Sequence, residues 1–429
     1  MVIEALRVPL IVTRKEKYAM LRYNHLFVGV DVSKHKHDVA ILNEQKQRVH
    51  KPLVIGDDRT GYELLLSKLQ RLKTEYQTQT FWIGMEATSD YWKNLYYFLK
   101  KQPQPFLVVV INPVQTKAFA KSELRRAKTD PVNARDIACF LVEKRPKASR
   151  DRAPIFDAIK DVDTQIYSLK KQQTMMLNKL RIELSKVAPE IERTTRYIDG
   201  QKILALLAAY PTAEAIAKAT VEQLHEVPYG RHQWFLPVSF IHQMKALAQN
   251  SVAHKTGPGS GVVVQSLVRR LSESQKEIEI LKEQIRKLYM QVTNKQSILT
   301  TIKGIGKETA CVLEAYIGDV NRFANAKKMV AYFGMNPVVN QSGKAKRKSY
   351  LQKKGSGIIR HKLYMATLNI VRRKCGPIYD YYARLVNAGK PKLVAIAAAM
   401  RKLLVIIYAM LKTQRLFDPN KHEPAKQKS

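Results

Sequence analysis

The sequence predicts a mixed architecture, with an α/β domain first and helical domains after it. Between residues 26 and 145, short apolar runs alternate with amphipathic helical patterns, as in a sheet covered by helices. From about 155 to 187 and from 264 to 292, apolar residues recur in steps of three and four, which is the period of a helix. The chain has 429 residues, which is enough for two or three domains.

The first domain is expected to contain three strands, a helix, a strand, a helix, a strand and a helix. The first two strands enclose a short polar turn, so they are predicted to form a β-hairpin. The last strand is apolar throughout, as expected of a buried parallel strand, and Asn112-Pro113 ends it. Residues 117–128 are basic, and we expect them to be mobile. The expected strands are 26–32, 38–44, 48–55, 80–85 and 106–111, and the expected helices are 60–73, 90–101 and 129–142.

Three acidic residues follow or open elements of this domain. Asp31 ends the first apolar strand, Glu86 ends the fourth, and Asp130 opens the last helix. This order of elements is that of the ribonuclease-H-like fold, in which such carboxylates meet around divalent metal. Clustered carboxylates repel one another, so the site is stable only with Mg²⁺ or Mn²⁺ bound. On the spacing alone, three unrelated surface acids explain the pattern equally well.

The charge balance indicates a polyanionic partner. The chain has 74 basic and 36 acidic residues, a net charge of +38 and a pI near 10.0. Nucleic acid is the favoured partner. An anionic membrane is disfavoured, because no apolar run approaches the roughly 20 residues of a spanning helix. The three cysteines are far apart, which argues against a zinc site and fits a reducing cytoplasm.

The middle of the chain is predicted to be helical and charged. The apolar positions from 264 to 292 form a heptad seam of about four repeats, interrupted by Ser274. This seam could pair with 155–187 in the same chain or with a second protomer, and the pattern alone favours neither. The expected divisions are an extension over 1–25, the α/β domain over 26–145, a helical and coiled-coil region over 146–297 with a flexible break near 254–261, a C-terminal domain over 298–418, and a disordered tail over 419–429.

The C-terminal domain has the composition of a phosphate-binding surface. Between Val320 and Phe417 a single acid, Asp380, stands among 21 lysines and arginines, whereas a merely solvated face would mix both signs. The domain opens with Gly304 and Gly306 in a Gly-x-Gly turn before a helix. Such a turn can present backbone N–H groups to a phosphate, as in a helix-hairpin-helix element.

A basic, turn-rich segment of this domain contains Ser342 beside a glycine. A serine in a strongly cationic loop could attack a phosphodiester, because positive charge lowers the cost of the alkoxide. From the residues alone, however, Gln-Ser-Gly is more simply an ordinary turn. The candidate nucleic-acid contacts are Gly304, Gly306, Lys344, Lys346, Arg347, Lys348, Lys353, Lys354 and Arg360.

Seven short motifs of the chain belong together: Gly29 to Lys34, Met85 to Thr88 with Tyr91-Trp92, Asn112-Pro113, Lys128 to Asp130, Tyr332 to Pro337, Gln341 to Gly343 and Lys353 to Gly355. Together these motifs resemble the IS-one-ten family of transposases, which are site-specific recombinases of bacterial insertion sequences and include the pilin-gene invertase group. The resemblance covers about 26–145 and 298–418. It implies a RuvC-like domain whose acids are Asp31, Glu86 and Asp130. The family has a fourth acid where this chain has Asn133, which can offer a neutral carbonyl oxygen to a metal but removes one negative charge.

The same resemblance implies the reaction and its partners. The family's nucleophile is the serine of Gln-Ser-Gly, here Ser342, which forms a covalent phosphoserine with DNA. The acids of one protomer, with Mg²⁺ or Mn²⁺, approach the serine of another, so a homo-oligomer (a dimer or tetramer) is expected. Donor and target DNA are selected by pairing with a structured bridge RNA. The setting is the bacterial cytoplasm, at the nucleoid.

Two other functions are open on the residues. A junction-resolving nuclease would use the acids for hydrolysis, would leave Ser342 structural and would form no protein–DNA adduct. A non-catalytic nucleic-acid-binding protein is suggested by Asn133 and would show no metal-dependent cleavage.

Overall fold

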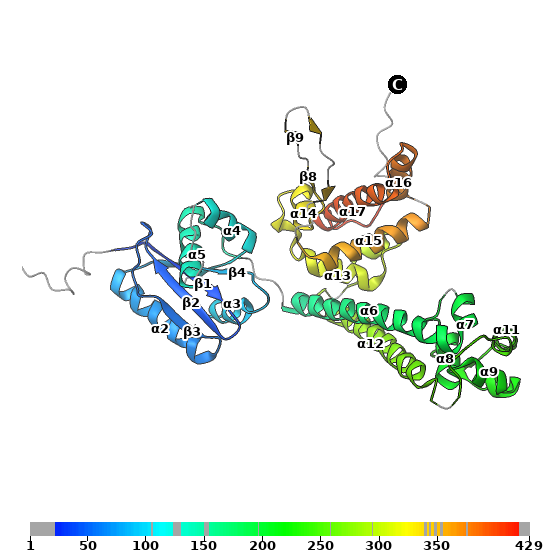
Figure 1. The fold of residues 1–429 in the computed structure, drawn as a ribbon. Helices are drawn as coiled ribbons and strands as arrows, with labels where there is room; N and C mark the ends of the chain where they lie inside the picture. Colours follow the sequence, from blue (N-terminus) through cyan, green and yellow to red (C-terminus); the bar gives the residue numbers. More distant parts are fainter. Residues whose placement is uncertain are drawn as a thin grey trace, which may run out of the picture. The chain divides into compact units, whose positions relative to one another are not determined.

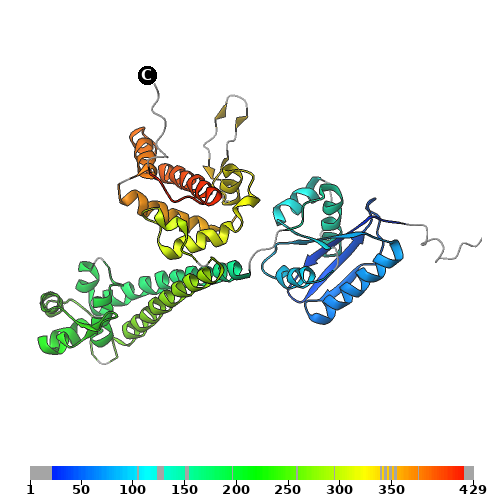
Figure 2. The same cartoon turned by 180° about the vertical axis from the view of Figure 1, so that it is seen from behind.

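The computed structural model divides the chain into two compact units, Met1–Asp151 and Arg152–Ser429. Figures 1 and 2 show their helices and strands from opposite sides. The structure describes residues 22–103, 106–122, 130–149, 154–195, 197–257, 259–293, 295–338, 341–342, 345–346, 350–351, 355–374 and 376–419, of which 130–132, 194, 338, 341–342, 345–346 and 350 are described by backbone only.

The N-terminal unit is built on a five-stranded sheet of order β3-β2-β1-β4-β5. The central strand β1 pairs antiparallel with β2, which pairs antiparallel with β3. On its other side β1 pairs parallel with β4, and β4 pairs parallel with β5. The strands are β1 (His25–Val32), β2 (Lys36–Leu42), β3 (Leu53–Gly56), β4 (Thr80–Glu86) and β5 (Phe106–Ile111).

Helices cover both faces of this sheet, and each face has its own core. One core joins Val28 and Val30 of β1 to α2 (Arg59–Tyr76) and α3 (Trp92–Lys100). The other joins Phe27 to α4 (Pro113–Ser122) and α5 (Asp130–Lys144). Figure 1 shows the two helix pairs on opposite sides of the sheet, and Figure 2 shows the same layers from behind. Alternate residues of β1 therefore contribute to different cores, as the two-residue period of a strand requires.

The predicted mixed α/β domain is confirmed, with two local corrections. The third strand begins at Leu53, because the residues before it contribute only an isolated bridge between Leu42 and Arg48. The segment expected to be mobile from 117 begins as helix α4, whose buried Thr116 and Phe119 are three residues apart and lie on one side. Residues 123–129 lie outside the described part. The assignment to the ribonuclease-H-like fold stays a prediction.

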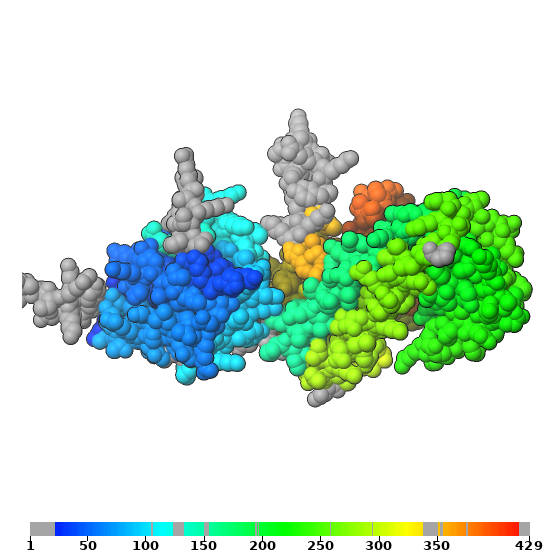
Figure 3. Space-filling model, turned by 60° about the horizontal axis from the view of Figure 1, so that its bottom comes forward, coloured from blue at the N-terminus to red at the C-terminus, as the bar shows by residue number. Residues whose placement is uncertain are grey.

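In the C-terminal unit the two long helices α6 (Pro154–Val187) and α12 (Val262–Thr293) pack against each other within the chain. Figure 3 shows them side by side. Leu184 shares a core with Leu267, and Ile159 shares another with Ile285, so the pair is antiparallel. The heptad seam is therefore buried in an intramolecular hairpin, which is the first of the two pairings that its pattern allows.

A small helical subdomain, here called the tip (188–261), connects the distal ends of α6 and α12. Its core includes Leu207, Ile216 and Ile241 and continues into the helical pair. Its elements are α7 (Pro189–Thr194), α8 (Gln201–Ala209), α9 (Ala213–Lys218), α10 (Val221–His225), the two-stranded hairpin β6 (Pro228–Tyr229) and β7 (Trp234–Phe235), and α11 (Val238–Gln249).

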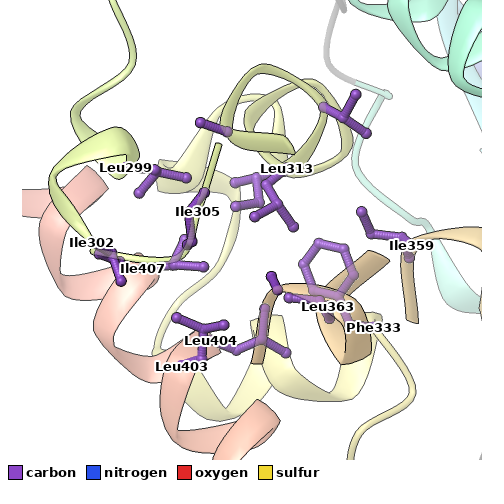
Figure 4. Packing of buried hydrophobic residues seen from close by; sticks show 14 of the residues in the cluster. Leu299, Ile302, Ile305, Leu313, Phe333, Ile359, Leu363, Leu403, Leu404 and Ile407 are labelled. Carbon is purple, nitrogen blue, oxygen red and sulfur yellow. The ribbon is translucent and has the colours of Figure 1, made fainter. Parts of the chain in front are cut away.

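The remainder of the C-terminal unit is mostly helical, as predicted. Figure 4 shows side chains of several segments meeting in its core, among them Leu313, Phe333, Leu363 and Leu404. The elements are η1 (Ile298–Thr301), α13 (Lys307–Ile317), η2 (Val320–Arg322), α14 (Ala326–Tyr332), β8 (Pro337–Val338), β9 (Gln341–Ser342), β10 (Ala345–Lys346), β11 (Tyr350–Leu351), α15 (Gly357–Arg372), α16 (Pro377–Asn387) and α17 (Lys392–Thr413).

Helix α17 corrects the expectation that no apolar segment approaches membrane-spanning length. By length and composition it could cross a membrane, with 22 residues and a mean hydropathy of 2.0 over its most apolar 18-residue window. Half of its most apolar window is buried inside the structure, however, and the Lys402 ammonium donates to the Pro377 carbonyl. These are properties of a core helix in a folded domain.

Candidate active site

Asp31 and Glu86 lie at one edge and on one face of the N-terminal sheet. β1 and β4 are parallel, and their last recorded partners are Val30 and Met85. The two acids are the next residues on their strands, so they are level with each other. Val30 and Met85 belong to the core under α2 and α3. Because side chains alternate along a strand, both acids point to the other face, which α4 and α5 cover.

A glycine sets the distance between β1 and α5. A Cβ atom placed on Gly29 would lie 2.0 Å from the Ala134 carbonyl oxygen and 2.5 Å from the Ala138 backbone nitrogen. No side chain fits there, so the α5 backbone rests directly on the strand. This contact brings the first turns of α5, including Asn133, next to Asp31.

Hydrogen bonds hold both acids in place. The Asn133 side-chain amide donates to Asp31 Oδ2 over 3.1 Å. The Thr116 hydroxyl of α4 donates to Glu86 Oε1, and the Thr88 hydroxyl lies 3.4 Å from Oε2. Sequence reasoning missed Thr116; its only sequence signal is its place in the first turns after Asn112-Pro113.

A further carboxylate lies on this face of the sheet. Asp38 of β2 is the register partner of Asp31 and is 8% exposed. Directly opposite residues of an antiparallel pair project to the same side, with Cβ atoms roughly 4.5–5.5 Å apart. Sequence reasoning missed Asp38 because the hairpin register, not the local pattern, places it there.

These residues offer an incomplete set of ligands for a divalent cation. Carboxylate and amide oxygens are the donors that Mg²⁺ and Mn²⁺ prefer. Among the described residues, however, no three His, Cys, Asp or Glu side chains are close enough together to hold a metal ion. Asp130 begins α5 on the same side of the sheet, but its side chain lies outside the described part. Asp136, three residues after Asn133, is a further carboxylate of α5 and is partly buried.

Ser342 lies in a second location, in the C-terminal unit. Its backbone forms β9, which pairs with β10 through Ser342 and Ala345. A second short pair, β8 with β11, adjoins this hairpin in sequence. Of the candidate nucleic-acid contacts, Lys346 is described by backbone only, and Lys344, Arg347, Lys348, Lys353 and Lys354 lie outside the described residues.

The other candidate contacts have intramolecular roles. The Arg360 guanidinium donates to the Gly355 carbonyl over 2.9 Å. Gly304 has a φ of 111°, and a Cβ there would lie 2.7 Å from the Ile370 side chain and 3.1 Å from its backbone nitrogen. Gly304 is thus required by packing against α15. Gly306 is the N-cap of α13 and has open space around it. The element before this turn is the short 3-10 helix η1, so the helix-hairpin-helix assignment stays a prediction.

The comparisons with known proteins agree on one family. A DEDD model of the IS110 (IS-one-ten) family, described as "Transposase", matches residues 28–189. A second model, described as "Transposase IS116/IS110/IS902 family", matches residues 296–383. The two matches together span more than half of the chain and include Asp31, Glu86 and Ser342.

Relatives align over nearly the whole chain. The pilin gene-inverting protein of Moraxella bovis is 23% identical over 398 residues, covering 92% of this chain and 99% of the relative. A 44.8 kDa protein of insertion element IS116 from Streptomyces clavuligerus is 22% identical over 400 residues, covering 93% and 97%. The chain therefore belongs to the IS110 family of transposases, which are enzymes of DNA recombination.

Proposed function

We propose that this transposase cuts and rejoins DNA through a phosphoserine at Ser342, assisted by a divalent cation at Asp31 and Glu86. One observation carries most of the proposal: strand register and alternation bring these two acids to the same edge and face of the sheet. Asn133 is hydrogen-bonded to Asp31 at that edge. A junction nuclease would need the same acids, so the family match is the argument for a serine step.

In the proposed reaction, each step forms one phosphate ester bond as it breaks another. The Ser342 hydroxyl oxygen forms a bond to the scissile phosphorus while the bond to one deoxyribose oxygen breaks, and that oxygen leaves with a proton. A hydroxyl of another DNA end then attacks the phosphorus and releases the serine. No oxidant, reductant or nucleotide is needed. The surrounding cations, Lys344 and Lys346 to Lys348, would neutralise the phosphate as its charge develops.

Asp31, Glu86, Asp130 and the Asn133 carbonyl would hold the cation. When bound, Mg²⁺ or Mn²⁺ supplies Lewis-acid stabilisation of charge on phosphate oxygens. To offer its carbonyl, Asn133 would have to turn its amide away from Asp31, so metal binding would replace the hydrogen bond between them. Thr116 would keep the Glu86 carboxylate oriented.

Further parts of the proposal rest on charge and family membership. Donor and target DNA, a structured bridge RNA and a homo-oligomer are the proposed partners, in the bacterial cytoplasm at the nucleoid. A net charge of +38 provides many phosphate contacts for such a complex. The RuvC-like fold and the helix-hairpin-helix contact through Gly304 and Gly306 belong to the same proposal.

The test is a covalent adduct. Wild-type protein incubated with element-end DNA and Mg²⁺ should give a DNA-linked band under denaturing conditions. Ser342→Ala should remove that band but change DNA affinity less than twofold, because phosphate–cation pairs dominate binding. Asp31→Ala should also remove it if both locations form one reaction centre.

Peptide mapping of the adduct decides the assignment. A linkage at Tyr350 would refute Ser342 as the nucleophile. Metal-dependent cleavage with free 3′-hydroxyl and 5′-phosphate ends and no adduct would establish the hydrolytic nuclease instead. Absence of any metal-dependent cleavage would leave the non-catalytic nucleic-acid-binding function.

A further inference from the structure

The tip exposes an unusual group of large aromatic side chains. Tyr197, Trp234 and Phe235 are 64%, 60% and 57% exposed. Isolated exposed apolar residues are ordinary, but several exposed rings together mark an interaction surface. The tip also falls almost entirely outside the two family matches, which end at 189 and resume at 296. Its surface therefore calls for an explanation separate from Ser342 and the acids.

A cavity of about 480 Å³ is lined by one of these rings, Tyr197. Its aromatic lining comes from Tyr197, Tyr229 and Phe240, and its side-chain amides come from Gln201 and Gln243. Among the described residues of the lining, Lys202 is the only charged one, and none of them is a carboxylate. The volume falls within the range of roughly 300–1,000 Å³ typical of small-ligand sites.

The β6–β7 hairpin holds the aromatic row in a fixed arrangement. Tyr229 and Trp234 are register partners, with ring centroids 6.1 Å apart. His232 stacks on Trp234 at 5.5 Å, and the Lys202 ammonium lies 5.6 Å from the Tyr229 ring centroid. Tyr229 thus lines the cavity and also contacts Trp234, which is exposed outside it. Rings held in this way lose little conformational entropy when a planar ligand stacks on them.

We propose that the tip binds unpaired nucleotides, with one base in the cavity between Tyr197 and Tyr229 and a neighbouring base stacked on Trp234. Aromatic rings bind the faces of bases without regard to sequence. The Gln201 and Gln243 amides can each donate to and accept from a base edge. Lys202 supplies a cation for the connecting phosphate. Single-stranded DNA and RNA share this chemistry, and we assign the site to DNA because DNA is the substrate of a transposase.

The charge of the cavity favours nucleic acid over other planar ligands. Another cavity, of about 350 Å³, lies in the N-terminal unit and is lined by Asp57, Asp58 and Arg59 together with Tyr62 and Phe98. Two carboxylates there would repel a phosphate. In its described lining, the tip cavity combines aromatic rings with one lysine and no carboxylate, so it suits a polyanion. This site goes beyond the proposed reaction, since it needs neither Ser342 nor the acids.

The test measures binding of a 15-nucleotide oligodeoxythymidine to the full-length protein in EDTA, so that no strand is cut. Tyr197→Ala and Trp234→Ala should each weaken binding by roughly 5- to 150-fold, as expected for one lost base stack. Tyr197→Phe keeps the ring and should bind like the wild type. Met175→Ala, at a 71% exposed position on α6, is the matched surface control.

A site-specific readout separates the tip from the other basic surfaces. An oligonucleotide carrying 5-bromodeoxyuridine should crosslink on irradiation to a peptide containing Tyr197, Tyr229 or Trp234. Crosslinks confined to other peptides, with alanine variants within twofold of the wild type, would overturn the proposal. Equal weakening of a 15-base-pair duplex by these variants would also overturn it. Tighter binding of an RNA of the same sequence would assign the site to RNA. A lower mass of the Trp234→Ala variant than of the wild type in light scattering would instead show that the exposed aromatic side chains of the tip form a self-association surface.

Discussion

At the residue scale, Asn133 stabilises Asp31 in a way that a carboxylate could not. Its amide donates to Asp31 Oδ2, and Asp38 lies opposite on the neighbouring strand. An aspartate at 133 would place a third negative charge beside these two. The hydrogen bond therefore holds the Asp31 carboxylate in place without adding negative charge beside it.

We predict that Asn133→Asp lowers the melting temperature in EDTA and gains more stability from Mg²⁺ than the wild type does. Losing a hydrogen bond to a charged group costs about 1.5–3 kcal/mol, and the new repulsion adds to this. Thermal unfolding across a Mg²⁺ titration measures both effects. Asn133→Ala removes the hydrogen bond without adding charge and serves as the control.

Two outcomes would contradict this assignment. Equal melting temperatures of Asn133→Asp and Asn133→Ala in EDTA would mean that position 133 does not sense Asp31. If Asp38→Asn does not raise the melting temperature of the Asn133→Asp variant in EDTA, the Asp38 carboxylate lies too far from position 133 to repel an aspartate there. The Mg²⁺ concentration needed for cleavage should fall in Asn133→Asp, since it has one more anionic ligand.

At the element scale, a buried ionic cluster joins three helices of the C-terminal unit. The Lys362 ammonium of α15 binds Asp163 of α6 and Glu308 of α13. The Asp163 side chain is only 1% exposed. Burial raises the pKa of this carboxyl, and Lys362 opposes the shift. The cluster fixes α6 to the domain that carries Ser342.

We predict that Lys362→Met destabilises the protein by about 3–5 kcal/mol, because Asp163 is left as an uncompensated buried charge. The double variant Asp163→Leu/Lys362→Met should recover most of this loss. The pKa of Asp163 is raised in the folded state, so the folded state binds the proton more tightly than the unfolded chain. The loss in free energy of unfolding caused by Lys362→Met should therefore become smaller as the pH falls towards 5. Urea unfolding at several pH values tests this, and a deficit independent of pH would refute it.

How far the sequence predicts these features depends on the range of the interaction. The strands ending at Asp31 and Glu86 are predictable, because an apolar run and the acid after it are local. Asp38 is not, because its place depends on the register of a hairpin. Helix α4 is not predictable, because it overlaps the start of a basic segment that is typical of a loop. The heptad seam of α12 would bury the same residues against α6 or against a second protomer. Its sequence pattern therefore cannot show which of the two is the partner.

At the scale of the whole molecule, charge dominates the expected behaviour. A net charge of +38 favours binding to any nucleic acid, and specificity must come from elsewhere. We predict that the purified protein retains a defined RNA and that sequence-specific DNA binding requires it. Sequencing of the retained RNA, with DNA binding measured before and after ribonuclease treatment at fixed salt, is the test. Random RNA with undiminished DNA specificity would favour direct readout of bases.

The antiparallel pairing of α6 and α12 has an evolutionary consequence. Both connections to the tip leave from the same end of the helical hairpin, at Val187 and Val262. A subdomain attached at such a point can be enlarged, exchanged or deleted without changing the path of the chain through the rest of the C-terminal unit. Replacing 188–261 by a short loop should leave the proximal half of the hairpin and the ionic cluster at Lys362 in place. Transposases that share the same chemistry could in this way acquire different nucleic-acid preferences by exchanging this one cassette.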